Sequence, residues 1–386
     1  MKKILLLVVA ASLVLVACAQ VIEPQAPAAQ NEAPAEQAQP AQEQNAQPAE
    51  PAAMPEPPAT PTGEVSELTV MTHDSFAVSE GVIAEFETRY NAKVSFLKAG
   101  DAGAVLNKAI LSKDAPLADI LYGVDNTFLS RALDANIYEA YASPLLQNIP
   151  DEFRLDQKNR ALPVDYGDVC INYSKSFFAK NELPVPASLD DLLKPEYFGM
   201  LVVENPATSS PGLAFLLATI QQYGDPGYLD YWAKLKENGL VVVDGWETAY
   251  YTNFTGSSGF GPQPMVVSYS TSPAAEVVFA ATELSDSPTA SITAPGTCFR
   301  QIEFAGILAG TKNRAIAEAF IDFMLDIQFQ ESMPLNMFVY PVNPKATIPD
   351  VFGYYGQPAA EPALAPDGLE ANRDRWIQDW TAIVMQ

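Results

Sequence analysis

The chain of 386 residues is longer than one ordinary domain, and about 150 residues per domain predicts two or three domains. Its 22 Lys and Arg residues against 47 Asp and Glu residues give a formal net charge of −25, so the phosphate backbone of a nucleic acid would be repelled. The single histidine, His73, excludes zinc centres built from several imidazoles, and any Ser-His-Asp triad would have to use this residue.

The first residues indicate export and lipid attachment. Lys2 and Lys3 precede an apolar run over residues 4–16, and the four residues that end at Cys18 have the pattern of a lipoprotein processing site. The run is shorter than the ~20 apolar residues of a membrane-spanning helix, although an uncleaved signal anchor remains the alternative. We therefore expect residues 1–17 to be a signal peptide. Lipid on Cys18 would hold the protein outside the cytoplasm, in the periplasm or on the outer face of the plasma membrane.

Residues 18–65 have the composition of a tether. Between residues 19 and 64 the chain holds ten of its 32 prolines, many Ala, Gln and Glu residues, and no aromatic residue. Such a segment cannot bury enough apolar surface to offset the entropy of ordering it. We expect a disordered, Pro-rich spacer between the membrane and the folded part.

From residue 66 onward, short apolar runs alternate with segments of helical period. Strands are expected at residues 68–72, 94–97, 118–123, 201–203, 240–243 and 265–269. Helices are expected at residues 80–91, 102–113 and 211–223, after Trp246 and after Pro273. Two successive β-α-β-α-β blocks predict an α/β fold with two lobes, each a mostly parallel sheet flanked by helices.

The ligand of an open α/β sheet lies outside the carboxyl ends of its strands. Carboxylates, hydroxyls and aromatics dominate there, in the segments His73-Asp74-Ser75-Phe76, Gly100-Asp101, Asp125-Asn126, Thr208-Ser209-Ser210-Pro211-Gly212, Gly245-Trp246 and Tyr269-Ser270-Thr271-Ser272-Pro273. Aromatic faces attract positive charge, aspartates neutralise it, and hydroxyls or helix N-termini orient polar edges. The mixture predicts a pocket for a flat cation, with no metal, no cofactor and no evident catalytic machinery.

These segments, in this order, resemble the thiamine-binding proteins of bacterial ABC importers. The resemblance runs from about Leu68 to the C-terminal helix and also includes Pro163-Val164-Asp165-Tyr166-Gly167 and Tyr340-Pro341-Val342. It implies a type II periplasmic-binding-protein fold, with residues 66–168 and 301–386 in a first lobe and residues 169–300 in a second. It further implies a monomer that closes on thiamine, thiamine phosphate or a related cationic pyrimidine or thiazolium compound and docks on a membrane permease.

The resemblance also implies the ligand contacts. Carried over residue by residue, they are Asp101, Ala102, Ser209, Ser210, Trp246, Tyr269, Ser270, Thr271 and Ser272. Further candidates from the matching segments are Asp74, Asp125, Asp165, Tyr166 and Phe338. The chain departs from the family pattern at Ala274-Ala275, where an aromatic residue is common, and at Phe338, where the family has tryptophan.

Structural roles compete with several of these assignments. Aspartates after strands and serines before helices often cap helices, so capping is the alternative role of Asp74, Asp125, Ser209 and Ser210. Trp246 precedes a helix rich in aromatics and would also fit a core. His73 fits a structural role or an edge contact. Tyr231-Trp232, the segment 376–380 and one face of a helix at 314–326 have the helical spacing of core residues.

Cys170 and Cys298 form the remaining pair in an oxidising compartment. In the resembling family these positions lie where the chain passes between the lobes, which implies adjacent hinge strands and a disulfide; two buried free thiols are the alternative.

A thiaminase-like enzyme, with Cys170 as nucleophile and Glu303 or Asp165 as base, is the alternative function. A third alternative, a ferric-ion binder on the same fold, is disfavoured because this chain lacks the adjacent tyrosine and the histidine ligands that such sites use.

Overall fold

The computed structural model describes residues 64–258 and 260–386, so the expected signal peptide, Cys18 and nearly all of the expected tether lie outside the described residues. The strands are β1 (Ser66–Thr72), β2 (Ala92–Lys98), β3 (Ile120–Asp125), β4 (Tyr138–Glu139), β5 (Leu162–Ser174), β6 (Leu201–Glu204), β7 (Val241–Val243), β8 (Met265–Tyr269), β9 (Thr289–Ile292), β10 (Phe299–Leu308) and β11 (Tyr340–Pro341). The helices are α1 (Glu80–Tyr90), α2 (Ala102–Leu111), α3 (Leu129–Asp134), α4 (Lys175–Lys180), α5 (Ser210–Tyr223), α6 (Gly227–Glu237), α7 (Thr255–Ser258), α8 (Ser272–Val278), α9 (Arg314–Leu325), α10 (Ile327–Met337), α11 (Asp350–Tyr355) and α12 (Leu369–Val384). Among these described helices, none has the length and apolar character needed to cross a membrane.

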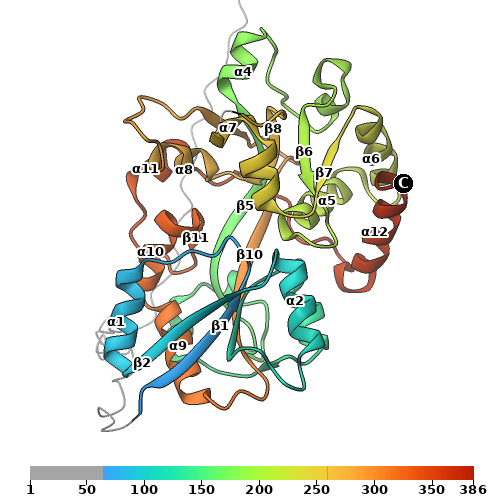
Figure 1. The fold of residues 1–386 in the computed structure, drawn as a ribbon. Helices are drawn as coiled ribbons and strands as arrows, with labels where there is room; N and C mark the ends of the chain where they lie inside the picture. The colour runs from blue at the N-terminus through green and yellow to red at the C-terminus, as the bar shows by residue number, and fades with distance from the viewer. Residues whose placement is uncertain (1–63, 259) are drawn as a thin grey trace, which may run out of the picture. The chain divides into compact units, whose positions relative to one another are not determined.

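The two expected blocks form the two ends of one sheet, whose strand order is β2-β1-β3-β10-β5-β8-β6-β7 (Figure 1). Strand β1 is parallel to β2 and β3, and β6 is parallel to β7 and β8. We call the β1–β3 end with its helices the first lobe and the β6–β8 end with its helices the second lobe. The α/β fold expected from the alternating pattern is confirmed.

Two long antiparallel strands, β5 and β10, join the blocks in the middle of the sheet (Figure 1). One part of β5 pairs with β10 and β11, and its later residues pair with β8 and β9. Sequence periodicity does not reveal these strands as elements, because buried Asp165, Asp168 and Asn172 interrupt the apolar pattern of β5. Both strands are largely buried along their length, so neither alternates between apolar and polar residues.

A disulfide joins β5 to the residue before β10. The sulfur atoms of Cys170 and Cys298 lie 2.10 Å apart and the Cα atoms 4.4 Å apart. Both residues are fully buried and pack with Ala359. Neighbouring Val169 and Phe299 are already paired in the β5–β10 ladder, so the bridge fixes the register of the two crossing strands.

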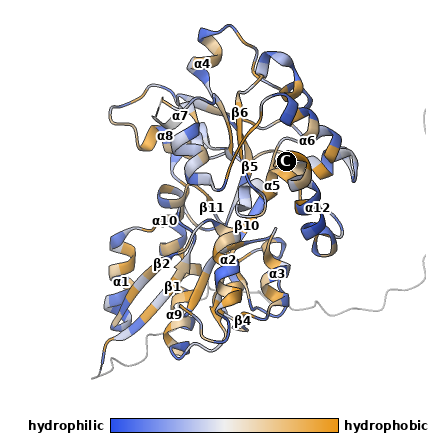
Figure 2. Cartoon of the chain, turned by 45° about the vertical axis from the view of Figure 1, so that its right-hand side comes forward, coloured by the Kyte–Doolittle hydropathy of each residue, from blue (hydrophilic) through white to orange (hydrophobic). Residues whose placement is uncertain are grey.

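The core contains the helical residues expected from their spacing. On α9, Phe320, Phe323 and Met324 are buried against the first-lobe sheet with α1. In the second lobe, the rings of Trp232 on α6 and Trp380 on α12 meet edge to face, 5.5 Å apart. Figure 2 shows the corresponding separation, with apolar colour inside and polar colour on outward parts of α4 and α12.

The C-terminal segment leaves the first lobe after α10. Helix α11 packs on α8 and helix α12 packs on α6, both in the second lobe. Arg375 and Trp376 of α12 donate hydrogen bonds to Asp225, which precedes α6. Residues beyond 350 therefore pack mainly on the second lobe, although Arg373 of α12 also donates a hydrogen bond of 3.1 Å to Ser130 of α3 in the first lobe.

We expect that replacing both bridged cysteines, Cys170→Ala with Cys298→Ala, will lower the free energy of unfolding by about 2–4 kcal/mol. The bridge restricts an unfolded chain in which the two residues are separated by 128 positions. Thermal unfolding followed by circular dichroism measures the effect. Reducing agent should bring the wild-type Tm down to that of the variant and leave the variant unchanged. Equal Tm values without reductant would contradict the expectation.

Candidate functional site

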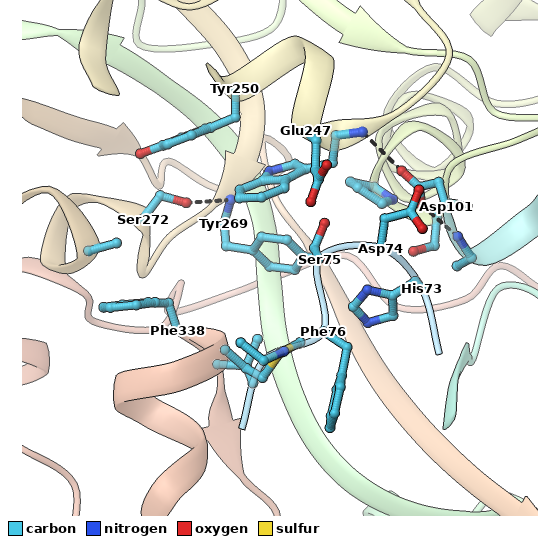
Figure 3. A pocket seen from close by; sticks show the side chains of 18 of the residues that line it. His73, Asp74, Ser75, Phe76, Asp101, Glu247, Tyr250, Tyr269, Ser272 and Phe338 are labelled. Carbon is cyan, nitrogen blue, oxygen red and sulfur yellow. Dashed lines mark hydrogen bonds between the residues drawn. The ribbon is translucent and has the colours of Figure 1, made fainter. Parts of the chain in front are cut away.

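A cavity of about 240 Å³ lies between the two lobes. The first lobe contributes the loop from His73 to Ala77, the start of α2, Glu303 of β10 and the end of α10. The second lobe contributes the start of α5, the turn from Trp246 to Tyr251, and α8 with the residues beside it. Figure 3 shows the rings of Tyr250, Tyr269 and Phe338 toward one side and the carboxylates of Asp74, Asp101 and Glu247 toward the other.

Asp101 connects the lobes at the edge of the cavity. Its Oδ1 accepts a hydrogen bond of 2.6 Å from the N–H of Ala102, which caps α2, and its Oδ2 accepts one of 2.9 Å from the N–H of Trp246. A Cβ at position 245 would make a tight contact of 3.1 Å with Oδ2, so glycine eases this approach. Burial raises the pKa of Asp101 above its usual value, although the two N–H donors oppose the shift.

Trp246 forms an aromatic wall. Its ring stacks on Tyr250 at 5.0 Å and meets Tyr251 edge to face at 5.5 Å. The indole Nε1 donates a 2.8 Å hydrogen bond to Ser268, which holds the ring against β8. Trp246 is only partly buried and lines the cavity, so it serves both the packing of the second lobe and the cavity surface.

A hydrogen-bond network through Gln301 organises the inner wall. Gln301 Nε2 donates to Ser210 at 2.7 Å and also to Asp125, while Gln301 Oε1 accepts from the hydroxyl of Tyr269 at 2.7 Å. Ser272 accepts from the backbone N–H of Tyr269 at 3.2 Å. Gln301 is buried on β10 and so ties groups from both lobes to the crossing strands.

The structure brings together many of the residues expected in the site. Those that line the cavity are Asp74, Asp101, Ala102, Ser210, Trp246, Tyr269, Ser272 and Phe338. Asp74 caps no helix; its Oδ1 accepts from the N–H of Gly100, which joins the first two loops. His73, expected in a structural role or as an edge contact, also lines the cavity.

The other expected residues lie behind the cavity wall. Ser209 and Ser270 are fully buried, and Thr271 donates to the backbone oxygen of Phe338, across the boundary between the lobes. Asp125 accepts from the N–H groups of Thr127 and Phe128 in the turn before α3, but it is not the cap of that helix, whose N-cap is Phe128.

Asp165 and Tyr166 of β5 are also placed away from the cavity surface. Asp165 is fully buried and accepts a hydrogen bond of 2.6 Å from Tyr122. Tyr166 packs between Phe153 and Tyr340, with the guanidinium of Arg300 over its ring at 4.9 Å.

Sequence reasoning did not assign several lining residues to the site. Tyr250 and Tyr251 belong to the aromatic-rich helix expected after Trp246, and Glu303 was considered only as a possible base of an enzyme; all three line the cavity. Phe279, one turn after Ala275, supplies an aromatic ring near the position where the Ala-Ala pair departs from the family pattern. Its ring centre lies 5.1 Å from that of Phe338, so these two rings meet beside the cavity.

The site carries more negative than positive groups. Asp74, Asp101, Glu247 and Glu303 line it, whereas Lys98 and His73 are the basic side chains in the lining. Lys98 is engaged by the backbone oxygen of Asp74 at 2.8 Å. Aromatic rings together with surplus carboxylates suit a flat organic cation.

The thiaminase-like alternative does not fit the structure. Cys170, the candidate nucleophile, is bonded to Cys298 and fully buried, so it has no thiol to react. Across residues 64–258 and 260–386, His, Cys, Asp and Glu side chains form no group that would hold a metal ion.

Comparison with known proteins gives the class. The chain belongs to the family of bacterial extracellular solute-binding proteins, whose family model matches residues 115–379. This membership decides between binding and catalysis: the protein binds a solute and is not an enzyme.

More particular similarities are to thiamine-binding proteins. The thiamine-binding periplasmic protein of Escherichia coli (strain K12) is 30% identical over 322 residues, which cover 82% of this chain and 93% of that protein. The protein described by the same words in Brucella abortus biovar 1 (strain 9-941) is 29% identical over 328 residues, covering 82% and 91%. A solved structure of a periplasmic thiamin binding protein superposes with a TM-score of 0.72 at 27% identity, covering 85% of this chain and all of that one, 100%. The resemblance drawn from the sequence is confirmed.

We expect Gln301→Met to destabilise the protein, because Asp125 Oδ2, the hydroxyl of Ser210 and the hydroxyl of Tyr269 each lose the hydrogen bond that Gln301 makes to them. The cost is about 1–3 kcal/mol for each group left unpaired, and urea unfolding measures the sum. Gln157→Met is the matched control, since Gln157 is exposed and makes one local hydrogen bond. Equal losses in the two variants would show that the Gln301 network does not stabilise the inner wall.

Proposed function

We propose that the protein captures thiamine, or a closely related cation such as thiamine phosphate, and delivers it to the permease of an ABC importer. The observation that carries the proposal is the cavity between the lobes, in which aromatic rings face surplus carboxylates. The names of the similar proteins point to the same ligand.

Each group of lining residues has a role in this proposal. Trp246 and Tyr269 cover the faces of the thiazolium or aminopyrimidine ring, where the electron-rich surfaces attract the positive charge. Asp74 and Asp101 compensate that charge. Ser210 and Ser272 supply hydroxyl groups to ring nitrogens or to the hydroxyethyl arm. Ser209, Ser270 and Thr271 lie behind the wall, and Thr271 holds the start of α8 through its hydrogen bond to the backbone oxygen of Phe338.

Closure of the lobes is the proposed capture step. The hydrogen bond from Trp246 N–H to Asp101 crosses between the lobes, as does the one of 3.0 Å from Gly103 N–H to Thr208 O. A ligand that contacts both lobes binds more tightly to the closed form and so shifts the population toward it.

We further propose that the protein works as a monomer, tethered outside the cytoplasm by lipid on Cys18. The spacer over residues 18–65 would let the folded part reach the permease. The acidic surface would attract a cationic ligand, an effect that salt weakens. Labelling with a radioactive fatty acid, compared between wild type and Cys18→Ser, tests the anchor.

Titration calorimetry with thiamine, thiamine phosphate and spermidine tests the ligand. We expect saturable binding of thiamine at one site per chain and no comparable binding of spermidine, which carries positive charge without a flat ring. Absence of thiamine binding would overturn the proposal, and equal binding of spermidine would show that charge alone is recognised.

Trp246→Ala should weaken thiamine binding by about 1–3 kcal/mol, which is roughly 5- to 150-fold in Kd, because a stacked ring is lost. Tryptophan fluorescence is altered by the change itself, so calorimetry is the measurement. Tyr354→Ala is the control, since this exposed aromatic does not line the cavity. An unchanged Kd with a lowered Tm would assign Trp246 to packing alone.

A further inference from the structure

Glu303 is a buried carboxylate that faces the cavity. It lies on β10 directly opposite Asp125 of β3 and Asp165 of β5 in the sheet register, so three carboxyl groups lie side by side. Glu303 is 5% exposed and lines the cavity, whereas the other two are fully buried and do not. Of these three carboxyl groups, Glu303 is therefore the one that can contact a ligand directly.

The neighbours of Glu303 keep it ionised. Its Oε2 accepts a 3.2 Å hydrogen bond from the hydroxyl of Tyr122, which also donates to Asp165 at 2.6 Å. Burial and the negative charge of Glu303 raise the pKa of Asp165 well above its usual value, so Asp165 holds the proton. Burial alone would raise the pKa of Glu303 too, but His73, Asp165 and Tyr122 together outweigh burial and lower that pKa.

His73 is the counter-ion of this carboxylate. Its Nε2 lies 3.4 Å from Glu303 Oε1, and both side chains are largely buried in the cavity lining. The ring fits because position 123 is glycine, where a Cβ would lie 2.4 Å from His73 Cδ2. A protonated His73 therefore places its positive charge at the cavity wall, beside the carboxylate that a cationic ligand would otherwise contact.

The surroundings of His73 favour its protonated form. Glu303 faces it from β10, Asp101 from the residue before α2, and Asp74 from its own loop. The ring of Tyr122 on β3 is 5.8 Å away, and Lys98 at the end of β2 lines the same cavity. Burial lowers the pKa of His73, but the three carboxylates outweigh burial and raise it above the ordinary value of 6.5.

We propose that Glu303 is the specificity-determining carboxylate for the positive charge of the ligand, and that His73 releases its proton to solvent when the cation binds. The inference rests on the proposed function, since it assumes a cationic ligand. In the free protein, imidazolium balances Glu303; in the complex, the ligand's charge takes over that role and His73 becomes neutral. A neutral ring of the same shape cannot displace the proton and binds less well.

The sign of the pH dependence follows from this exchange. Below the pKa of His73 in the free protein, binding has to expel one proton, so the affinity for thiamine falls as pH falls. The fall approaches about tenfold per pH unit for one proton. Above that pKa the affinity is independent of pH. His73 is the single histidine of the chain, which makes the assignment direct to test.

Titration calorimetry with thiamine, in phosphate and in Tris at the same pH, measures the proton released, because the two buffers take it up with different heats. We expect release of more than half a proton per bound thiamine at pH 6.5 and a rise in affinity as the pH is raised from 6. His73→Gln should remove both effects. Glu303→Gln should weaken binding at pH 8 by at least tenfold and abolish proton release.

Asp125→Asn is the control for another titrating group. Burial raises the pKa of Asp125 to about 7, so it titrates in the same range, although its side chain does not line the cavity. We expect this variant to keep the proton release. Loss of the release in Asp125→Asn together with its persistence in His73→Gln would overturn the proposal. Should Glu303→Gln fail to fold by circular dichroism, the comparison of the other two variants decides.

The two proposals fail in different ways. If wild type binds thiamine at pH 8 but releases no proton at pH 6.5, the role of His73 and Glu303 is refuted and thiamine capture stands. If thiamine does not bind at any pH, the proposed function itself is refuted.

Discussion

The antiparallel pairing of β5 with β10 is the constraint on which the rest of the structure depends. Both parallel blocks attach to this pair, and the disulfide between Cys170 and Cys298 fixes its register. Because the pair is shared, the loops at the ends of β1, β2, β6 and β8 face one another instead of pointing into solvent on separate domains. The cavity exists because the two sheets are halves of one sheet.

The same pair places polar groups where a core would ordinarily be apolar. Asp125, Glu303 and Asp165 lie in register across three strands, and Gln301 reaches both lobes. Buried carboxyl groups are costly unless they are protonated or hydrogen-bonded. Tyr122, His73 and the Gln301 network meet that condition, so this polar centre both holds the crossing strands together and gives the cavity its electrostatic character.

Much of the fold and part of the site follow from sequence. The parallel blocks could be predicted because their strands are apolar runs between helical segments, and the strand-end rule finds Asp101, Trp246 and Ser272. The rule fails for β10, where buried polar residues such as Gln301 break the pattern. It also misses Phe279, because a residue at the end of a helix enters a cavity only through tertiary packing, which periodicity does not encode.

The position of helix α12 bears on how the two lobes could move relative to each other. The folded chain starts with β1 in one lobe, whereas the segment from Leu369 to Val384 packs mainly on the other, through α6 and Asp225. Arg373 of this helix also donates a hydrogen bond to Ser130 of α3 in the first lobe. The lobe opening proposed above would therefore have to break the hydrogen bond between Arg373 and Ser130 before this helix could move with the second lobe. A donor fluorophore on an exposed turn of α12 and an acceptor on α1 would lie on different lobes. Energy transfer between them would report the distance between the lobes in single molecules over time.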